Sequence, residues 1–241
     1  MEIIERKNNR IVFKAEVDES IANAIRRYMG HIPILAIDEI EISKNDSPLY
    51  DETIAHRIGL IPINTDRGVN EKSTASFKLS TDKEGTVYSG QLKGAVKVVY
   101  DKIPITLINK GQEFELTAHA RAGIGIEHAK FSPGFMFYRN SANAKIEKDC
   151  PQEILESCKK NMIKTEGGKI IISDVYSSDL CEAAIEKYMK EGKTQIEIIP
   201  SEDLVITVES FGQMEAEDMF RKAIETLKKD LATVEKKVDK D

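Results

Sequence analysis

The sequence has 241 residues, of which 41% are hydrophobic and 32% charged, the balance of a folded globular protein. Its net charge of −6 and its lack of tryptophan argue against a protein that holds nucleic acid by itself, because such a protein presents a basic face or rings that stack on bases. The start, MEIIERKNNR, lacks the apolar stretch of a signal peptide, and no run approaches the roughly 18 apolar residues that span a bilayer. We therefore expect a cytoplasmic protein with one main domain and an insertion.

An amphipathic helix is predicted near the N-terminus. It follows Asp18, a plausible N-cap, and Gly30 and Pro33 end it. Its apolar side chains recur at i, i+3, i+4 and i+7 and are Ile21, Ala24, Ile25 and Tyr28. Strands are predicted around this helix at 11–17 and 37–43, and a short second helix at 51–59.

The middle of the chain is predicted to be rich in strands and loops. Residues 64–94 are polar and predict loops with short strands, and residues 120–134 predict turns. Further strands are predicted at 96–100, 103–108 and 114–120. The segment that follows indicates a small α+β unit, with helices at 152–163 and 179–191 and strands at 169–173, 195–199 and 204–208.

The last segment has an apolar stripe at heptad spacing. Steps of four and three residues connect Phe220, Ile224, Leu227, Leu231, Val234 and Val238. The stripe either packs on its own domain or faces a partner, and the pattern alone leaves both open. Burying six such side chains is worth roughly 9–18 kcal/mol gross, which can cover the ~4–15 kcal/mol that association costs.

No catalytic or metal motif is present in the sequence. The four histidines have no metal-ligand spacing, and no Walker A sequence or GxSxG elbow occurs. The cysteines, Cys150, Cys158 and Cys181, are not spaced as in a zinc site or a ferredoxin run. We predict three small, inert thiols.

Four stretches together resemble the family of the archaeal RNA polymerase protein known by the letter D, which includes the N-terminal domain of the bacterial alpha subunit and the eukaryotic third-largest subunit. They are NAIRRYMGHIPILAIDEIEI (23–42), DETIAHRIGLIPI (51–63), ELTAHARAGIGIEHAKFSP (115–133) and LVITVESFGQMEAEDMFRKAIETLKKDL (204–231). The resemblance runs nearly from end to end, and the first and third stretches are quite specific.

The resemblance implies an α+β fold in three parts. A split dimerisation domain, made of a sheet and two amphipathic helices, would comprise 1–40 plus 204–241. A β-rich insert domain would comprise 41–142, and a small ferredoxin-like α+β domain 143–203.

The resemblance also implies a non-catalytic assembly subunit of DNA-directed RNA polymerase. It would form a heterodimer with the small subunit L and then engage the large catalytic subunits, meeting DNA only through the complex and no membrane. The chain stops soon after the heptad stripe, whereas bacterial alpha continues into a DNA-binding domain, and this favours a heterodimer over a homodimer. The expected partner-binding residues are Ile21, Ala24, Ile25, Arg26, Arg27, Tyr28, Phe220, Ile224, Leu227, Leu231 and Val234.

Arg26 and Arg27 match the paired basic positions of the family, where they would serve the dimer interface or a large-subunit contact. Periodicity alone is equally compatible with a solvated helix face at these two positions.

Members of the family often carry a zinc loop or an iron–sulfur cluster, and we expect neither here. Residues 64–95 contain no cysteine. Residues 143–203 resemble the ferredoxin-like domain of some members, but Ser178, Cys181 and Ala184 stand where that domain has CxxCxxC. A cluster needs three or four thiolates in one cage.

Other classes of function remain as alternatives. The first is a ferredoxin-like redox or binding module with a C-terminal coiled coil, which a coloured cluster would reveal. A nucleic-acid binder in its own right is disfavoured by the acidic charge, and an enzyme by the lack of any acid/base or nucleophile set.

Overall fold

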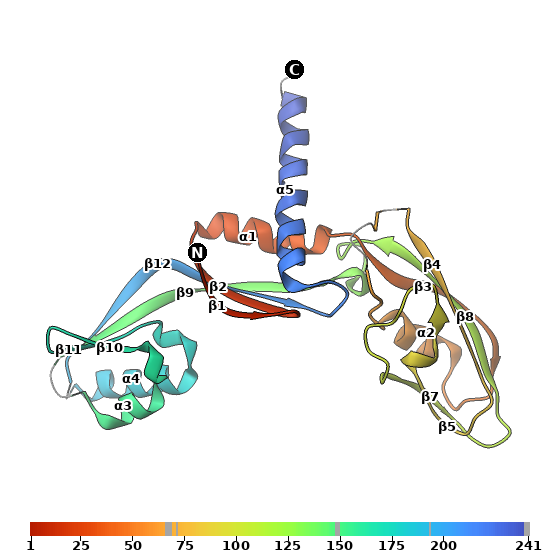
Figure 1. Cartoon of the computed structure of the whole chain (residues 1–241), viewed down its shortest axis with the longest axis horizontal. Helices are drawn as coiled ribbons and strands as arrows, with labels where there is room; N and C mark the ends of the chain where they lie inside the picture. Colours follow the sequence, from red (N-terminus) through yellow and green to blue (C-terminus); the bar gives the residue numbers. More distant parts are fainter. Residues whose placement is uncertain (66–68, 71, 148–149, 193, 239–241) are drawn as a thin grey trace. The chain divides into compact units, whose positions relative to one another are not determined.

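A computed structural model describes residues 1–65, 69–70, 72–147, 150–192 and 194–238. The fold is α+β, as the sequence predicts, with several separate sheets (Figure 1). By its contacts the chain divides into two compact units. Unit 1 comprises Met1–Ile4, Val12–Glu19 and Tyr138–Ile206, and unit 2 comprises Glu5–Ile11, Ser20–Phe137 and Thr207–Asp241. These units do not follow the three predicted domain ranges, which stay a prediction.

One six-stranded sheet supplies most of unit 1. Its strands, in spatial order, are β1 (Glu2–Lys7), β2 (Arg10–Glu16), β12 (Ile196–Ser210), β9 (Gly134–Ile146), β11 (Lys169–Ile172) and β10 (Ile163–Glu166). Strands β10 and β11 form an antiparallel hairpin that pairs with the end of β9, where Ile170 faces Ile146. The hairpin turn contains Gly167 and Gly168, both at positive φ, which glycine adopts without steric cost.

Two helices cover this end of the sheet in unit 1. They are α3 (Gln152–Ser157) and α4 (Asp179–Glu191). Helix α4 ends at Gly192, whose φ of 65° is the left-handed conformation typical of a helix C-terminus. The small core between helices and strands consists of Ala142, Ala144, Ile146, Ile154, Cys158, Ile172, Val175, Cys181, Ala184 and Ile185.

The β-rich part of unit 2 is built on a second sheet. Its strands, in order, are β3 (Ile34–Asn45), β8 (Phe114–Gly123), β4 (Thr74–Thr81) and β6 (Lys93–Gly94), and a two-stranded sheet pairs β5 (Gly85–Tyr88) with β7 (Pro104–Ile108). Helix α2 (Asp51–Gly59) begins with acidic residues and ends with basic ones, as the helix dipole prefers. Its Ile54 and Ile58, spaced i and i+4, are fully buried in the largest core of the molecule.

Unit 2 also contains the two amphipathic helices. They are α1 (Glu19–Tyr28), which continues into a 3₁₀ turn at Met29–His31, and α5 (Ala216–Val238). Acidic residues occupy the first turn of α5 and lysines its last. Figure 1 shows the C-terminal turns of α5 standing clear of the other elements of unit 2.

Several predicted elements are confirmed, and some are wrong. The helices at 51–59 and 179–191 have the predicted bounds. The helix predicted at 152–163 ends at Ser157, because Cys158 is extended and a 3₁₀ turn and β10 follow. The strand predicted at 96–100 is wrong: only an isolated bridge joins Val98 to Ile63. The two strands predicted at 195–199 and 204–208 are one long strand, β12.

Candidate partner-binding surface

Helix α1 has a buried face and a neighbouring apolar face. Ala22, Ile25 and, one turn later, Met29 are buried, at the i, i+3, i+7 spacing of a single helix face. Ile21 is half-exposed, and Ala24 and Tyr28 are partly exposed. Of the four residues in the predicted stripe, the structure therefore places Ile25 in the molecule's own core and the other three on the adjacent face.

Arg26 and Arg27 are exposed at the end of α1. The Arg26 guanidinium donates two hydrogen bonds, of 3.1 and 2.9 Å, to the Asn23 side-chain oxygen three residues earlier. This pair of bonds holds Arg26 along the helix surface without neutralising its charge.

Helix α5 likewise separates a buried face from an apolar one. Its buried residues are Ala216, Met219 and Ala223, again at i, i+3 and i+7. The predicted heptad stripe lies beside this face rather than on it. Its first members, Phe220, Ile224 and Leu227, are partly buried, and the next two, Leu231 and Val234, are 59% and 57% exposed.

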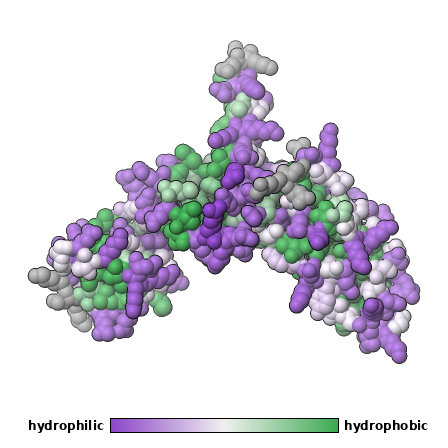
Figure 2. Space-filling model, viewed as in Figure 1, coloured by the Kyte–Doolittle hydropathy of each residue, from purple (hydrophilic) through white to green (hydrophobic). Residues whose placement is uncertain are grey.

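A hydrogen bond joins the two helices. The Tyr28 hydroxyl donates to the Asp230 carboxylate at 3.1 Å, and the Tyr28 ring stacks on His31 with centroids 4.5 Å apart. Loss of solvent and the hydrogen bond to Asp230 raise the pKa of Tyr28 above its usual value, so it remains a donor at neutral pH. The apolar faces of α1 and α5 thereby lie near each other, and Figure 2 shows hydrophobic surface gathered over α1 and around the base of α5.

The segment after β8 packs against the end of α1 and is fixed by a charge network. Asp38 accepts hydrogen bonds from Lys130 and, at 2.6 Å, from Arg121, and both cations lie over the Phe131 ring. The bond from Lys130, with help from Arg121, holds the pKa of Asp38 below its usual range. Sequence reasoning missed Asp38, because its partners lie 83 and 92 residues away.

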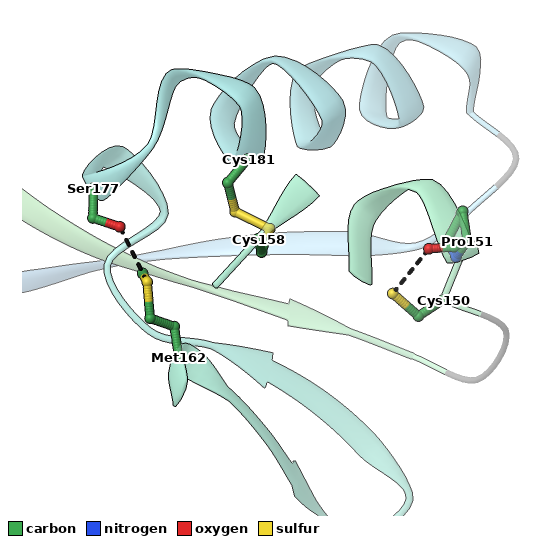
Figure 3. The surroundings of a disulfide bond; sticks show 6 residues. All are labelled: Cys150, Pro151, Cys158, Met162, Ser177 and Cys181. Atoms are coloured by element: carbon green, nitrogen blue, oxygen red, sulfur yellow. Dashed lines mark hydrogen bonds between the residues drawn. A yellow bond between two sulfur atoms is a disulfide. The ribbon is translucent and has the colours of Figure 1, made fainter. Parts of the chain in front are cut away.

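The cysteines differ from the prediction of three inert thiols. Cys158 and Cys181 form a disulfide that joins the end of α3 to the first turn of α4, with both side chains buried in the small core (Figure 3). Cys150 is free, its thiol directed at the Pro151 carbonyl 3.8 Å away, and burial raises its pKa. Spacing along the chain offered no sign of the disulfide, since the pair is 23 residues apart.

Two further kinds of feature are absent from the part of the chain that the structure describes. No cluster of three or more histidine, cysteine, aspartate or glutamate side chains there has the arrangement of a metal site. None of the helices described is both long and apolar enough to cross a membrane.

Comparison with known proteins identifies the β-rich part of unit 2 first. Residues 40–137 match the family described as the RNA polymerase Rpb3/RpoA insert domain. These residues run from the middle of β3 to the start of β9 and include α2 and the largest core. A domain of this class is a part of multisubunit RNA polymerases.

Relatives that align along nearly the whole chain then define the family. DNA-directed RNA polymerase subunit Rpo3 of Thermococcus kodakarensis is 34% identical, and the match covers 93% of this chain and 92% of that protein. Subunit Rpo3 of Pyrococcus furiosus is also 34% identical, over 94% and 92%. Subunit 3 of DNA-directed RNA polymerases II, IV and V of Arabidopsis thaliana is 32% identical, over 91% and 84%. The chain belongs to the RNA polymerase Rpo3 family, and the resemblance drawn from the four sequence stretches is confirmed.

Proposed function

We propose that this chain is the non-catalytic assembly subunit of its RNA polymerase. It pairs with the small subunit L through the apolar faces of α1 and α5, and the pair then engages the large catalytic subunits. Nucleotidyl transfer belongs to the large subunits, and this chain meets DNA only through the complex. As part of a transcription complex it acts in the cytoplasm.

The observation that carries the proposal is the unpacked stripe on α5. A helix packed only on its own domain exposes polar side chains on its remaining faces. Here Leu231 and Val234 are more than half exposed, in line with Phe220, Ile224 and Leu227. Exposed apolar stripes of this length normally mark an interface. Covering five such side chains contributes roughly 7–15 kcal/mol gross, comparable with the ~4–15 kcal/mol cost of association.

The two helices divide the interface between them. Ile21, Ala24 and Tyr28 contribute from α1, next to the stripe of α5. Ile25 acts from beneath, because its burial fixes the helix on its own unit. Arg26 and Arg27 form a charged rim that contacts subunit L or a large subunit, and a rim charge of this kind contributes more to specificity than to affinity.

We further infer that the chain binds neither an iron–sulfur cluster nor structural zinc. Two of its three sulfurs are joined to each other, and a disulfide offers no thiolate to iron or zinc. Cys150 alone cannot make a cage. Anaerobic purification followed by metal analysis and visible absorption is the test: we expect no absorption and well under one metal per chain. Stoichiometric iron or zinc would contradict the inference.

Co-expression with subunit L tests the pairing itself. We expect the isolated chain to self-associate, because the stripe seeks cover, and to become a one-to-one heterodimer when subunit L is present. Size-exclusion chromatography with light scattering distinguishes the two. A well-behaved monomer at micromolar concentration that ignores subunit L would refute the proposal.

A further inference from the structure

A second surface of unit 2 has the features of a docking site. A hollow of about 410 Å³ is lined by Leu60, Pro62, Tyr100, Ile103, Ala129, Lys130, Ser132, Ser210, Phe211 and Gln213. Three segments that are far apart in the sequence build its walls: the end of α2, the turn before β9, and the loop between β12 and α5. Each of them lies in one of the stretches that carry the family resemblance, and none takes part in the faces of α1 and α5 described above.

The walls of the hollow are fixed by the backbone. The Ser210 hydroxyl accepts a hydrogen bond from the Gly212 N–H and donates one to the Met214 carbonyl. The Thr65 N–H donates to the Gln213 carbonyl at 3.0 Å. Gly212, at a φ of 101°, leaves no room for a side chain, since a Cβ there would lie 2.6 Å from Val99. The hollow is therefore preformed, as binding sites usually are.

Exposed aromatic rings extend the hollow along β9. Phe211 contacts Phe135 with ring centroids 5.9 Å apart, and Phe135 stacks on Phe137 at 6.1 Å. These three rings are 43–45% exposed, and Tyr100 and Leu60 at the other end are about half exposed. Since a large side chain offers about 150–250 Å², the contiguous apolar surface is on the order of 400 Å². One side of a standard protein interface needs about 800 Å², a little over half of it apolar.

The hollow also contains a buried acceptor. Gln213 is 6% exposed, and its Oε1 has no hydrogen-bond partner among the residues that the structure describes. Leaving such an atom unpaired is costly, and a donor brought by a ligand would relieve that cost. Lys130, the only charged lining residue, is already bonded to Asp38, so the hollow recruits no counter-ion.

We propose that this hollow and the ring stripe dock a segment of a large catalytic subunit. The segment inserts an apolar side chain that carries an N–H or O–H donor, as tryptophan and tyrosine do, and that donor bonds to Gln213 Oε1. The area of the stripe selects a protein over a small molecule, because it extends well beyond the hollow. The inference rests on the proposed function and locates the large-subunit contact on a different surface from that of subunit L.

The test is recovery of large subunits with the tagged chain, co-expressed with subunit L and the rest of the polymerase. Phe135→Ser with Phe211→Ser should lower that recovery at least tenfold while subunit L remains bound. Gln213→Met, which keeps the shape and removes the acceptor, should lower it about tenfold. The matched control is Tyr88→Ser, an exposed ring of the same unit outside the stripe, with recovery unchanged.

Circular dichroism and a melting curve establish that each variant folds, and Leu60→Ser replaces the double variant should that one unfold. Unchanged recovery in folded variants overturns the inference. So does loss of subunit L together with the large subunits, which would assign the stripe to the small partner. A dimer of the isolated chain that Phe135→Ser dissociates would assign it to a second copy and overturn it as well. Failure of the proposed function is distinct, because the unaltered chain would then recover no subunit L.

Discussion

Gly123 lies where β8 runs against the ring of Phe131. A Cβ at this position would lie 2.8 Å from three atoms of that ring. The ring cannot easily yield, because it is fully buried and the Arg121 guanidinium lies 4.7 Å from its centroid. Gly123→Ala should therefore lower the free energy of unfolding by about 1–3 kcal/mol, the usual cost of overpacking.

Urea unfolding measures this change, and Gly30→Ala is the control. A Cβ at Gly30 meets only Ile126, at 3.9 Å, which is ordinary contact. The control should lose well under 1 kcal/mol. Equal stability of the two variants would show that the turn before β9 is not packed as described.

Asp38 makes stability depend on pH. Lys130 and Arg121 depress its pKa in the folded state, so its contribution is present above the ordinary aspartate pKa of about 4 and is lost as pH falls through the folded value. Asp38→Asn should be less stable than the unaltered chain at pH 7, and the difference should shrink as the pH drops below about 4. Unfolding curves at several pH values measure it. A difference that grows toward low pH would contradict the assignment.

At the residue scale, the sequence predicts side chains better than it predicts their partners. The apolar positions of α1 follow from helical periodicity alone. Periodicity could not separate Ile25, which is buried, from Ile21, which is half-exposed, because both fall within one wide stripe. Nor could it find Asp38 or Gln213, whose roles depend on residues that only the folded chain brings near.

Among the elements, those with strong local signals were predictable. Helix α2 has acidic residues at its start, buried isoleucines at i and i+4, and Pro62 just beyond its end. Strand β9 was missed along most of its 13 residues, because Arg139, Asn140, Ser141 and Asn143 interrupt the alternation of apolar residues. The structure accommodates these polar groups with partners from elsewhere: Arg139 makes two hydrogen bonds to Asp174.

The disulfide between α3 and α4 should stabilise the small core of unit 1. That core contains few large side chains, and closing a loop of this length is worth about 3 kcal/mol in the unfolded-chain model. Cys158→Ala with Cys181→Ala should make the segment 150–192 sensitive to proteolysis at a lower temperature. Cys150→Ala, which leaves the bond intact, is the matched control. Identical digestion of both variants would show that the bond contributes little.

For the whole molecule, contacts and sequence divide the chain differently. Strands β2, β9 and β12 each continue from one compact unit into the other, so no cut in the sequence matches a cut in the contacts. The α+β class and the family were nevertheless predictable from four stretches spread along the chain. The two faces of α5 were not, because the buried residues Ala216, Met219 and Ala223 lie immediately beside the heptad stripe.

Pairing of two α5 variants with subunit L tests the central claim most directly. Ile224→Asp with Leu227→Asp places two charges in the apolar stripe; each lost contact costs about 1.5–3 kcal/mol and each buried unpaired charge several more. Lys236→Asp with Lys237→Asp changes two exposed positions farther along the same helix. Co-purification with subunit L and circular dichroism provide the readout. We predict that the first variant keeps its secondary structure and loses subunit L, while the second still pairs. If the first variant still pairs with subunit L, or if it unfolds throughout, the stripe belongs to the chain's own packing and the interface is elsewhere.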